Sequence, residues 1–312
     1  MEFGLHLPAS TPGVKSEDLV RFARQAEALG FYCITVADHV IVPKKISIPY
    51  PYTVDGKYPG TGYHLETLTT MSFLAGATER IRFVASVMIA PYRNPVIAAK
   101  MLASLDVLSH GRVIVGLGVG WMKEEFESLK APRFEDRGRV TDEYIRAFRE
   151  LWIEENPSFT GEYCKFSEIC FLPKPLQKPT IPIWIGGHSK QALRRAGELG
   201  DGWHPIGGVP TIPLEPEDVA RAWETLADYA RKAGRDPKAI RIALKGSLFD
   251  REKQATPGKR RRFIGSADDI VADIREYRSA GVDTLIFDVR QPSSAETLHR
   301  MEWLAKEVIA KV

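Results

Sequence analysis

Asp38 and His39 are the neighbouring residues whose types most directly suggest chemistry. They follow the apolar run Cys33–Ala37, so a carboxylate and an imidazole leave the end of a predicted strand together. Histidine titrates near neutrality and serves as a general acid or base, which makes His39 the candidate catalytic residue. The alternative interpretation is a pair that hydrogen-bonds to the rim of the fold.

Two glycine-rich turns could hold a phosphate group. Residues 116–121 read GLGVGW after one apolar run, and residues 186–189 read GGHS between another run and an amphipathic segment. Glycines allow close backbone approach, and the N–H groups at a helix start attract anions. Ser189 is also a natural N-cap, so the second turn is the stronger candidate. The first turn matches the dinucleotide fingerprint only in part, and we do not predict a Rossmann site.

A long strand exit at residues 85–93 contains a third candidate. Ser86 and Val87 lie where a bulge or a strained peptide would suit a flat ligand lying against the strand. Arg93, at the end of this exit, is expected on the rim. Arg290, which follows the last apolar run, could present a cation to an anionic substrate, or it could form an ion pair between loops.

The elements that must position these residues alternate along the whole chain. Short apolar runs and longer amphipathic segments form eight pairs, the pattern of βα units around a parallel sheet. Eight pairs without a break in composition predict one domain over residues 1–312, an α/β fold of the (β/α)8 TIM barrel type with inserted loops. The apolar runs lie at about residues 3–7, 32–37, 81–89, 112–119, 181–185, 202–204, 240–244 and 282–288.

Three segments account for the residues beyond a minimal barrel. Residues 41–63 carry four tyrosines and are expected to cover the pocket, and residues 155–180 are expected to cross the barrel with one short hairpin. The third is the loop after the seventh strand, which carries the basic run 259–262. We expect this run to be a solvated loop or, alternatively, to contact an anion.

Composition excludes several classes of function. The chain has 312 residues and a net charge of +3, so there is no electrostatic footprint for nucleic acid. Three cysteines without CxxC spacing predict reduced thiols and a cytoplasmic protein. No stretch resembles a leader or approaches the ~20 apolar residues of a membrane span. Strand ends lack the clusters of His and Asp that a metal site would need, so none is predicted.

Several motifs resemble the luciferase-like monooxygenase superfamily, in matching order along the chain. Tyr50-Pro51-Tyr52 and Asp55-Gly56 in the long loop after the second strand resemble the coenzyme F420-dependent branch more narrowly. The resemblance implies a (β/α)8 barrel that holds F420, or alternatively FMN, at its C-terminal face, and a homodimer. The motifs are Asp38-His39, residues 91–95, residues 105–112, residues 118–121 with Glu125-Phe126, residues 182–187 and residues 200–203.

The resemblance also implies roles for individual residues. Asp38 and His39 would face the ring, and Ser86-Val87 would form a bulge, often with a cis peptide, that backs it. The phosphate would be held by Gly186, Gly187, His188 and Ser189, with Gly120, Trp121 and Glu125 beside it.

Three functions follow as hypotheses. The first is hydride transfer between F420 and a small organic substrate, with His39 as proton donor or acceptor and with Tyr50 and Arg290 as candidate substrate contacts. The second is a two-component monooxygenase that uses O2 and FMNH2 supplied by a separate reducing enzyme. The third is a cofactor-binding protein without catalysis. Under the first, the basic run 259–262 could contact the anionic tail of F420.

Overall fold

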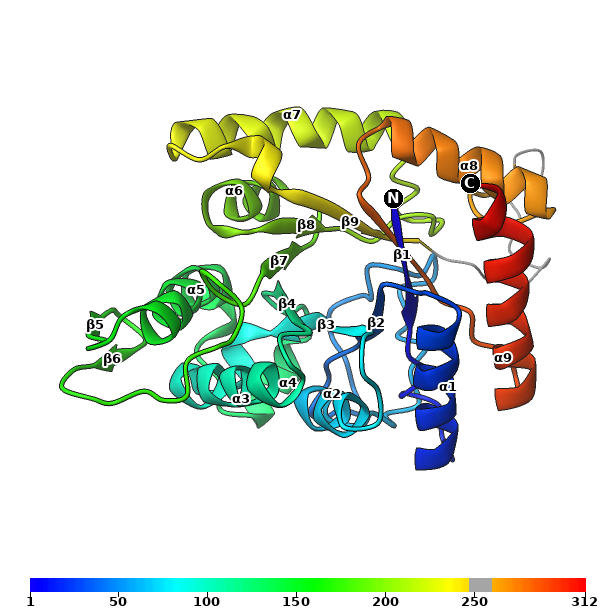
Figure 1. Ribbon diagram of the computed structural model, residues 1–312. Helices are drawn as coiled ribbons and strands as arrows, with labels where there is room; N and C mark the ends of the chain where they lie inside the picture. The colour runs from blue at the N-terminus through cyan, green and yellow to red at the C-terminus, as the bar shows by residue number, and fades with distance from the viewer. Residues whose placement is uncertain (247–259) are drawn as a thin grey trace.

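The computed structural model describes residues 1–246 and 260–312, and within them eight parallel strands close into a barrel surrounded by helices (Figure 1). The closed order is β1-β10-β9-β8-β7-β4-β3-β2, which confirms the predicted (β/α)8 barrel. The barrel strands are β1 Glu2–His6, β2 Cys33–Val36, β3 Arg82–Ile89, β4 Val113–Gly118, β7 Ile183–Gly186, β8 Gly202–His204, β9 Arg241–Lys245 and β10 Thr284–Phe287.

The helices follow the strands as expected, with one addition. The segment after β4 forms two helices rather than one, because the chain turns at Lys130, which has a positive φ, before Pro132. The helices are α1 Ser16–Ala28, α2 Thr67–Ala75, α3 Pro95–Leu108, α4 Lys123–Ser128, α5 Arg137–Ile153, α6 Lys190–Leu199, α7 Pro216–Lys232, α8 Ala267–Ser279 and α9 Ser294–Trp303.

The segment between α5 and β7 contains the predicted hairpin. Strands β5 (Phe159–Thr160) and β6 (Lys165–Phe166) pair antiparallel, outside the barrel. The observed barrel strands are mostly shorter than the apolar runs, because those runs continue into buried or partly buried loop residues.

The barrel interior is built in layers. An apolar cluster of six buried residues, separate from the larger core between strands and helices, comprises Cys33, Val84, Ile114, Trp184, Ala243 and Ile286. Side chains of a strand alternate between its two faces, so the residues two positions further on point into the barrel as well. These are Thr35, Ser86, Gly116, Gly186, Lys245 and Asp288. The next layer toward the C-terminal mouth is therefore polar or made of glycine.

The basic run departs in part from the expectation of a solvated loop, because Arg260 is exposed but both Arg260 and Arg262 pair with acids. Arg260 donates two hydrogen bonds to Asp273, at 2.7 and 2.8 Å, and Arg262 bonds to Asp273 at 2.9 Å and to Glu215 at 2.8 Å. The Asp273 side chain is completely buried in α8. Their charges are thus committed within the fold, because a buried carboxylate needs cationic partners. Lys259 lies outside the described residues.

Candidate active site

His39 is held at the barrel mouth by a buried carboxylate. Its Nδ1 lies 2.8 Å from Oε2 of Glu125, whose side chain is completely buried. A carboxylate accepts hydrogen bonds, so Nδ1 donates and Nε2 is the ring atom left for other partners. No hydrogen bond to Nε2 is formed within residues 1–246 and 260–312. Glu125 therefore fixes both the orientation and the tautomer of the imidazole.

Glu125 is positioned by α4 and is fully engaged. Its Oε1 accepts hydrogen bonds from the backbone N–H groups of Val40 and Ile41, at 2.8 and 3.2 Å, and its Oε2 also accepts one from the Tyr92 hydroxyl at 3.0 Å. The resemblance placed Glu125 beside the phosphate, whereas its carboxylate contacts His39. The α4 helix is absent from the eight predicted pairs, so the sequence offered no signal for this contact.

Asp38 faces inward, to Arg93. The Arg93 guanidinium donates to both carboxylate oxygens of Asp38, at 2.8 and 2.7 Å, and to Glu66 at 2.7 Å. Thr67 and the backbone N–H of Ile89 complete the partners of Asp38, each at 2.9 Å. Arg93 is thus a buried support rather than the rim residue expected. The carboxylate of Asp38 holds the end of β2, on which His39 stands.

The strand exit of β3 carries the predicted bulge. The Ser86–Val87 peptide is cis, and the pairing of β3 with β4 shifts between Ala85 and Met88, which confirms the local geometry expected from the resemblance. Both residues are partly exposed in a strand that is otherwise largely buried. They are therefore accessible to a ligand at the mouth.

Glycines of two neighbouring strands make room for Val87. A Cβ atom on Gly118 would lie 2.4 Å from a Val87 methyl carbon, and Cβ atoms on Gly116 and Gly186 would lie 3.4 and 2.8 Å from another. Side-chain carbons do not approach to 2.4 or 2.8 Å, so Gly118 and Gly186 are required by shape. This packing explains most of the GLGVG run without a phosphate, whereas Gly120 needs its glycine for a positive φ of 84°.

The GGHS turn leads directly into α6. Gly187 has a φ of 97°, and the Ser189 hydroxyl accepts a hydrogen bond from the N–H of Ala192, which confirms Ser189 as the N-cap. The first N–H groups of a helix have no intrahelical acceptor and favour an anion. His188, Ser189 and Lys190 are exposed. The turn is thus open to solvent and suited to a phosphate.

An aromatic cluster covers the mouth from the segment 41–63, which we call the lid. Tyr50 lies 5.1 Å from Trp121 and 5.2 Å from Tyr58 between ring centroids, and His39 lies 5.4 Å from Tyr58. The Tyr58 hydroxyl bonds to Nε2 of His64 at 2.9 Å. Burial raises the pKa of Tyr58 to about 12 and lowers that of His64 to about 4, so both are neutral at pH 7.

Arg290 forms an ion pair within its own loop. Its guanidinium donates to Asp288 at 2.6 to 3.0 Å, and Asp288 is almost completely buried. The interior layer also contains groups that were not selected from the sequence: His6 bonds to Thr35 at 2.9 Å, and His204 bonds to Ser86 at 2.8 Å. Each histidine stands two positions beyond a glycine, Gly4 or Gly202, that pairs with a member of the apolar layer, so extending that layer across β1 and β8 identifies them.

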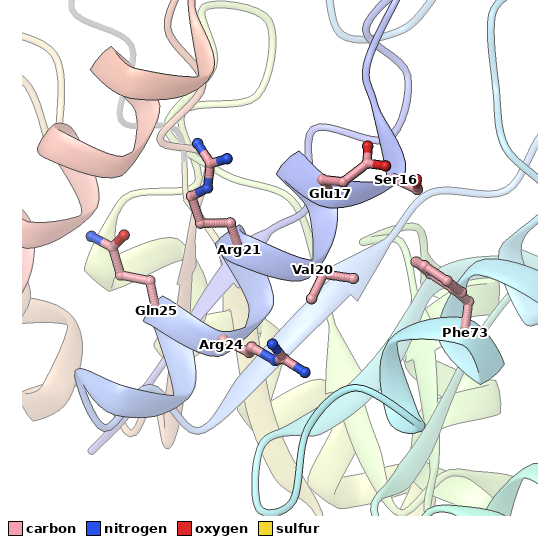
Figure 2. A pocket seen from close by; sticks show the side chains of 7 residues that line it. All are labelled: Ser16, Glu17, Val20, Arg21, Arg24, Gln25 and Phe73. Carbon is pink, nitrogen blue, oxygen red and sulfur yellow. The ribbon is translucent and has the colours of Figure 1, made fainter.

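A shallow groove of about 730 Å³ lies elsewhere, on the outside of the barrel between α1 and α2 (Figure 2). It includes none of the residues at the mouth, so we do not assign the active site to it. Its lining residues are Ser16, Glu17, Val20, Arg21, Arg24, Gln25 and Phe73.

Two features that the described residues lack bear on other kinds of function. Across residues 1–246 and 260–312, no three His, Cys, Asp or Glu side chains are grouped so that they could hold a metal ion. In the same part of the chain, no helix has both the length and the apolar character needed to cross a membrane.

Sequence relatives cover most of the chain. An uncharacterized protein of Mycobacterium tuberculosis is 32% identical over 282 residues, which span 89% of this chain and 96% of that protein. An F420-dependent glucose-6-phosphate dehydrogenase of Amycolatopsis mediterranei is 27% identical over 89% of this chain and 90% of its own. An FMNH2-dependent dimethylsulfone monooxygenase of Pseudomonas putida is 35% identical, over 54% of this chain and 47% of its own.

Solved structures share the fold. A monooxygenase from Streptomyces bottropensis superposes with a TM-score of 0.79 at 22% identity, covering 100% of this chain and 99% of its own. The F420-dependent tetrahydromethanopterin reductase of Methanopyrus kandleri superposes with a TM-score of 0.76 at 19% identity, covering 99% of each chain.

The family model described as luciferase-like monooxygenase matches residues 1–256. Its members are oxidoreductases and monooxygenases, and the relatives above include users of F420 and of FMNH2. The chain therefore belongs to the luciferase-like monooxygenase family and is an enzyme of this class.

Proposed function

We propose that the protein is an F420-dependent oxidoreductase that transfers a hydride to or from a small organic substrate. The observation that carries this proposal is the pairing of His39 with Glu125 at 2.8 Å. Reduction of a carbonyl or imine needs a proton beside the hydride, and oxidation needs a base to remove one. An imidazole fixed by a buried carboxylate, with its second nitrogen left for other partners, fits that requirement.

The residues at the mouth fit a flat, phosphate-bearing cofactor. Val87 and Ser86 are partly exposed, and the glycines beside Val87 keep that surface free of other side chains. The GGHS turn and the start of α6 would hold the phosphate. When bound, F420 supplies the carbon, C5, that donates or accepts the hydride. His39 Nε2 would exchange the proton with the substrate, while Glu125 keeps the ring oriented.

Asp38 and Trp121 are proposed to act around the cofactor rather than on the substrate. Through its hydrogen bonds to Arg93, Asp38 would hold the end of β2 and so fix the position of His39. Trp121 would close the cofactor side of the mouth together with Tyr50, which it contacts. Tyr50 and Arg290 remain the candidate substrate contacts.

The second candidate is an FMNH2-dependent monooxygenase supplied by a separate reducing enzyme. The match to the Pseudomonas putida monooxygenase, 35% identical over 173 residues, favours it. F420 does not react with O2 in the way that reduced FMN does, so the two cofactors give different reaction classes.

Fluorescence titration of the purified protein with F420 and with FMN separates the two candidates. We expect micromolar affinity for F420, and micromolar affinity for FMN alone would refute the assignment. The variant His39→Ala should bind F420 with unchanged affinity and turn over about 10²–10⁴ times more slowly. His299→Ala, an exposed histidine on α9, is the matched control. Unchanged turnover in His39→Ala would remove the proposed role.

We further propose that the chain works as one cytoplasmic domain in a homodimer. Large apolar side chains are exposed on the outer faces of α2 and α3, and those on α3 recur at helical spacing. Phe73 belongs to α2, and Ile97, Met101 and Leu108 belong to α3. Light scattering should give a dimer mass, and Ile97→Glu should give a monomer.

A further inference from the structure

Lys245 is a lysine inside the barrel at its mouth. It stands two positions beyond Ala243 of the apolar layer, so it points inward like the other members of the next layer. Its backbone is fixed, since its N–H donates to Pro205 and its carbonyl accepts from Gly207, both at 2.9 Å. Part of the residue remains accessible to solvent, although it lies deep in the fold.

The ammonium group of Lys245 has no direct partner in the part of the chain that the structure describes. Neither a hydrogen bond nor an ion pair of its Nζ is formed there, whereas the polar groups around it are engaged. Asp288 accepts hydrogen bonds from Arg290, His6 bonds to Thr35, and His204 bonds to Ser86. A cation at this depth without a partner is costly, which points to a ligand that supplies one.

The charges around Lys245 define what the ligand must carry. Asp288 and Arg290 cancel each other as an ion pair. His6 and His204 are neutral at pH 7, because burial lowers the pKa of both, that of His204 to about 4. Burial lowers the pKa of Lys245 to about 8, so it is mostly charged at pH 7. One positive charge is therefore left among these five groups.

We propose that Lys245 binds a carboxylate group of the substrate. A monoanion balances the single remaining charge, whereas a phosphate dianion would leave an uncompensated negative charge in the barrel. The proposal rests on the proposed function, since it orients the substrate in the same mouth as His39. It narrows the substrate class to small carboxylic acids, with an aromatic or apolar body that suits the tyrosines of the lid.

The test uses benzoate as the probe and benzamide as its neutral counterpart, with no cofactor present. Calorimetry should show benzoate binding to the wild type and to Lys245→Arg. Lys245→Met, which keeps most of the length of the side chain without its charge, should bind it about ten- to a hundredfold more weakly. Lys232→Met, at the exposed end of α7, is the matched control and should bind like the wild type.

A second measurement titrates the wild type and uses Lys245→Met only to assign the resonance. In protein labelled with ¹³C at the lysine ε carbons, the resonance missing from Lys245→Met should titrate near pH 8. Benzoate should raise this midpoint, since an adjacent anion stabilises the ammonium, and benzamide should leave it unchanged. The midpoint itself is read from the wild type, so it does not report the stability of the variant.

Three results would overturn the proposal. They are equal benzoate affinity of Lys245→Met and the wild type, a midpoint that benzoate does not move, and tighter binding of phenyl phosphate than of benzoate. Because the measurements need neither F420 nor turnover, their failure leaves the cofactor assignment standing. Conversely, failure of the F420 titration would leave a positive benzoate result intact.

Discussion

Replacing Arg93 by Met, which keeps an unbranched apolar stem and removes the guanidinium, should destabilise the protein substantially. The change leaves Asp38, which is 5% exposed, with only Thr67 and the N–H of Ile89 as hydrogen-bond donors. Removing one partner of a buried ion pair costs about 3–5 kcal/mol, because the remaining charge stays buried without compensation.

The expected change in melting temperature follows from the length of the chain. Unfolding entropy is about 2.1 cal/mol/K per residue, or roughly 0.66 kcal/mol/K for a chain of this size. A loss of about 3–5 kcal/mol then lowers the melting temperature by about 5–8 °C. The effect should be the same with and without cofactor if Asp38 serves to support the end of β2.

Differential scanning calorimetry at one fixed scan rate measures this change, since a protein of this size can unfold irreversibly. Arg133→Met is the matched control, because the Arg133 side chain is 79% exposed and pairs loosely with Glu135 at 3.9 Å. We expect a shift of about 1 °C or less there. The double variant Arg93→Met with Asp38→Asn should lose less than the sum of the two single variants. A melting temperature of Arg93→Met equal to that of the control would refute the reasoning.

Three further perturbations test other contacts. Glu125→Gln should slow turnover by up to about 10²-fold in steady-state assays, because a neutral amide stabilises the imidazolium less well. Gly118→Ala should cost about 1–3 kcal/mol by thermal unfolding, because its methyl group would meet Val87 at 2.4 Å, and Val87→Ala should restore most of the loss. Acidification from pH 6.5 to 4 should lower the melting temperature by about 4 °C through His204. The unfolded state binds the proton first, since the pKa of His204 is about 4 in the fold and 6.5 outside it.

Each of these has its own control. For Glu125→Gln, the dissociation constant of the cofactor should stay within a few-fold of the wild type, and a large rise would indicate a cofactor contact instead. For Gly118→Ala, failure of Val87→Ala to restore stability would show that the close approach is relieved elsewhere. For His204, the variant His204→Gln should lose less stability on acidification, and a decline equal to that of the wild type would contradict the assignment.

The barrel and the bulge were predictable because they depend on local pattern. Alternating apolar runs define the strands, and the residues at strand ends must meet at one face once the barrel closes. The motif around Ser86 indicated the shifted register that the structure has. The N-cap at Ser189 is likewise a property of neighbouring residues in the chain.

Partner choice across long separations was not predictable. Arg93 could be placed on the rim by its position alone, but its partner Asp38 lies 55 residues away. Whether Arg93 stays on the rim or pairs with an acid depends on distances that only the folded chain sets. The sequence did not predict the ion pairs of the basic run for the same reason. Their partner Asp273 is buried, although it lies in an amphipathic helix pattern in which an acid is ordinarily exposed.

The two N–H bonds that Glu125 receives from Val40 and Ile41 couple the entrance of the barrel to its chemistry. Val40 precedes the lid and Ile41 begins it, so displacing the chain there removes half of the hydrogen bonds that hold the carboxylate. The same carboxylate orients His39. Opening the entrance at Val40 and Ile41 would therefore misalign the imidazole. We expect proton transfer to be favoured while the entrance is closed and the reactants are enclosed.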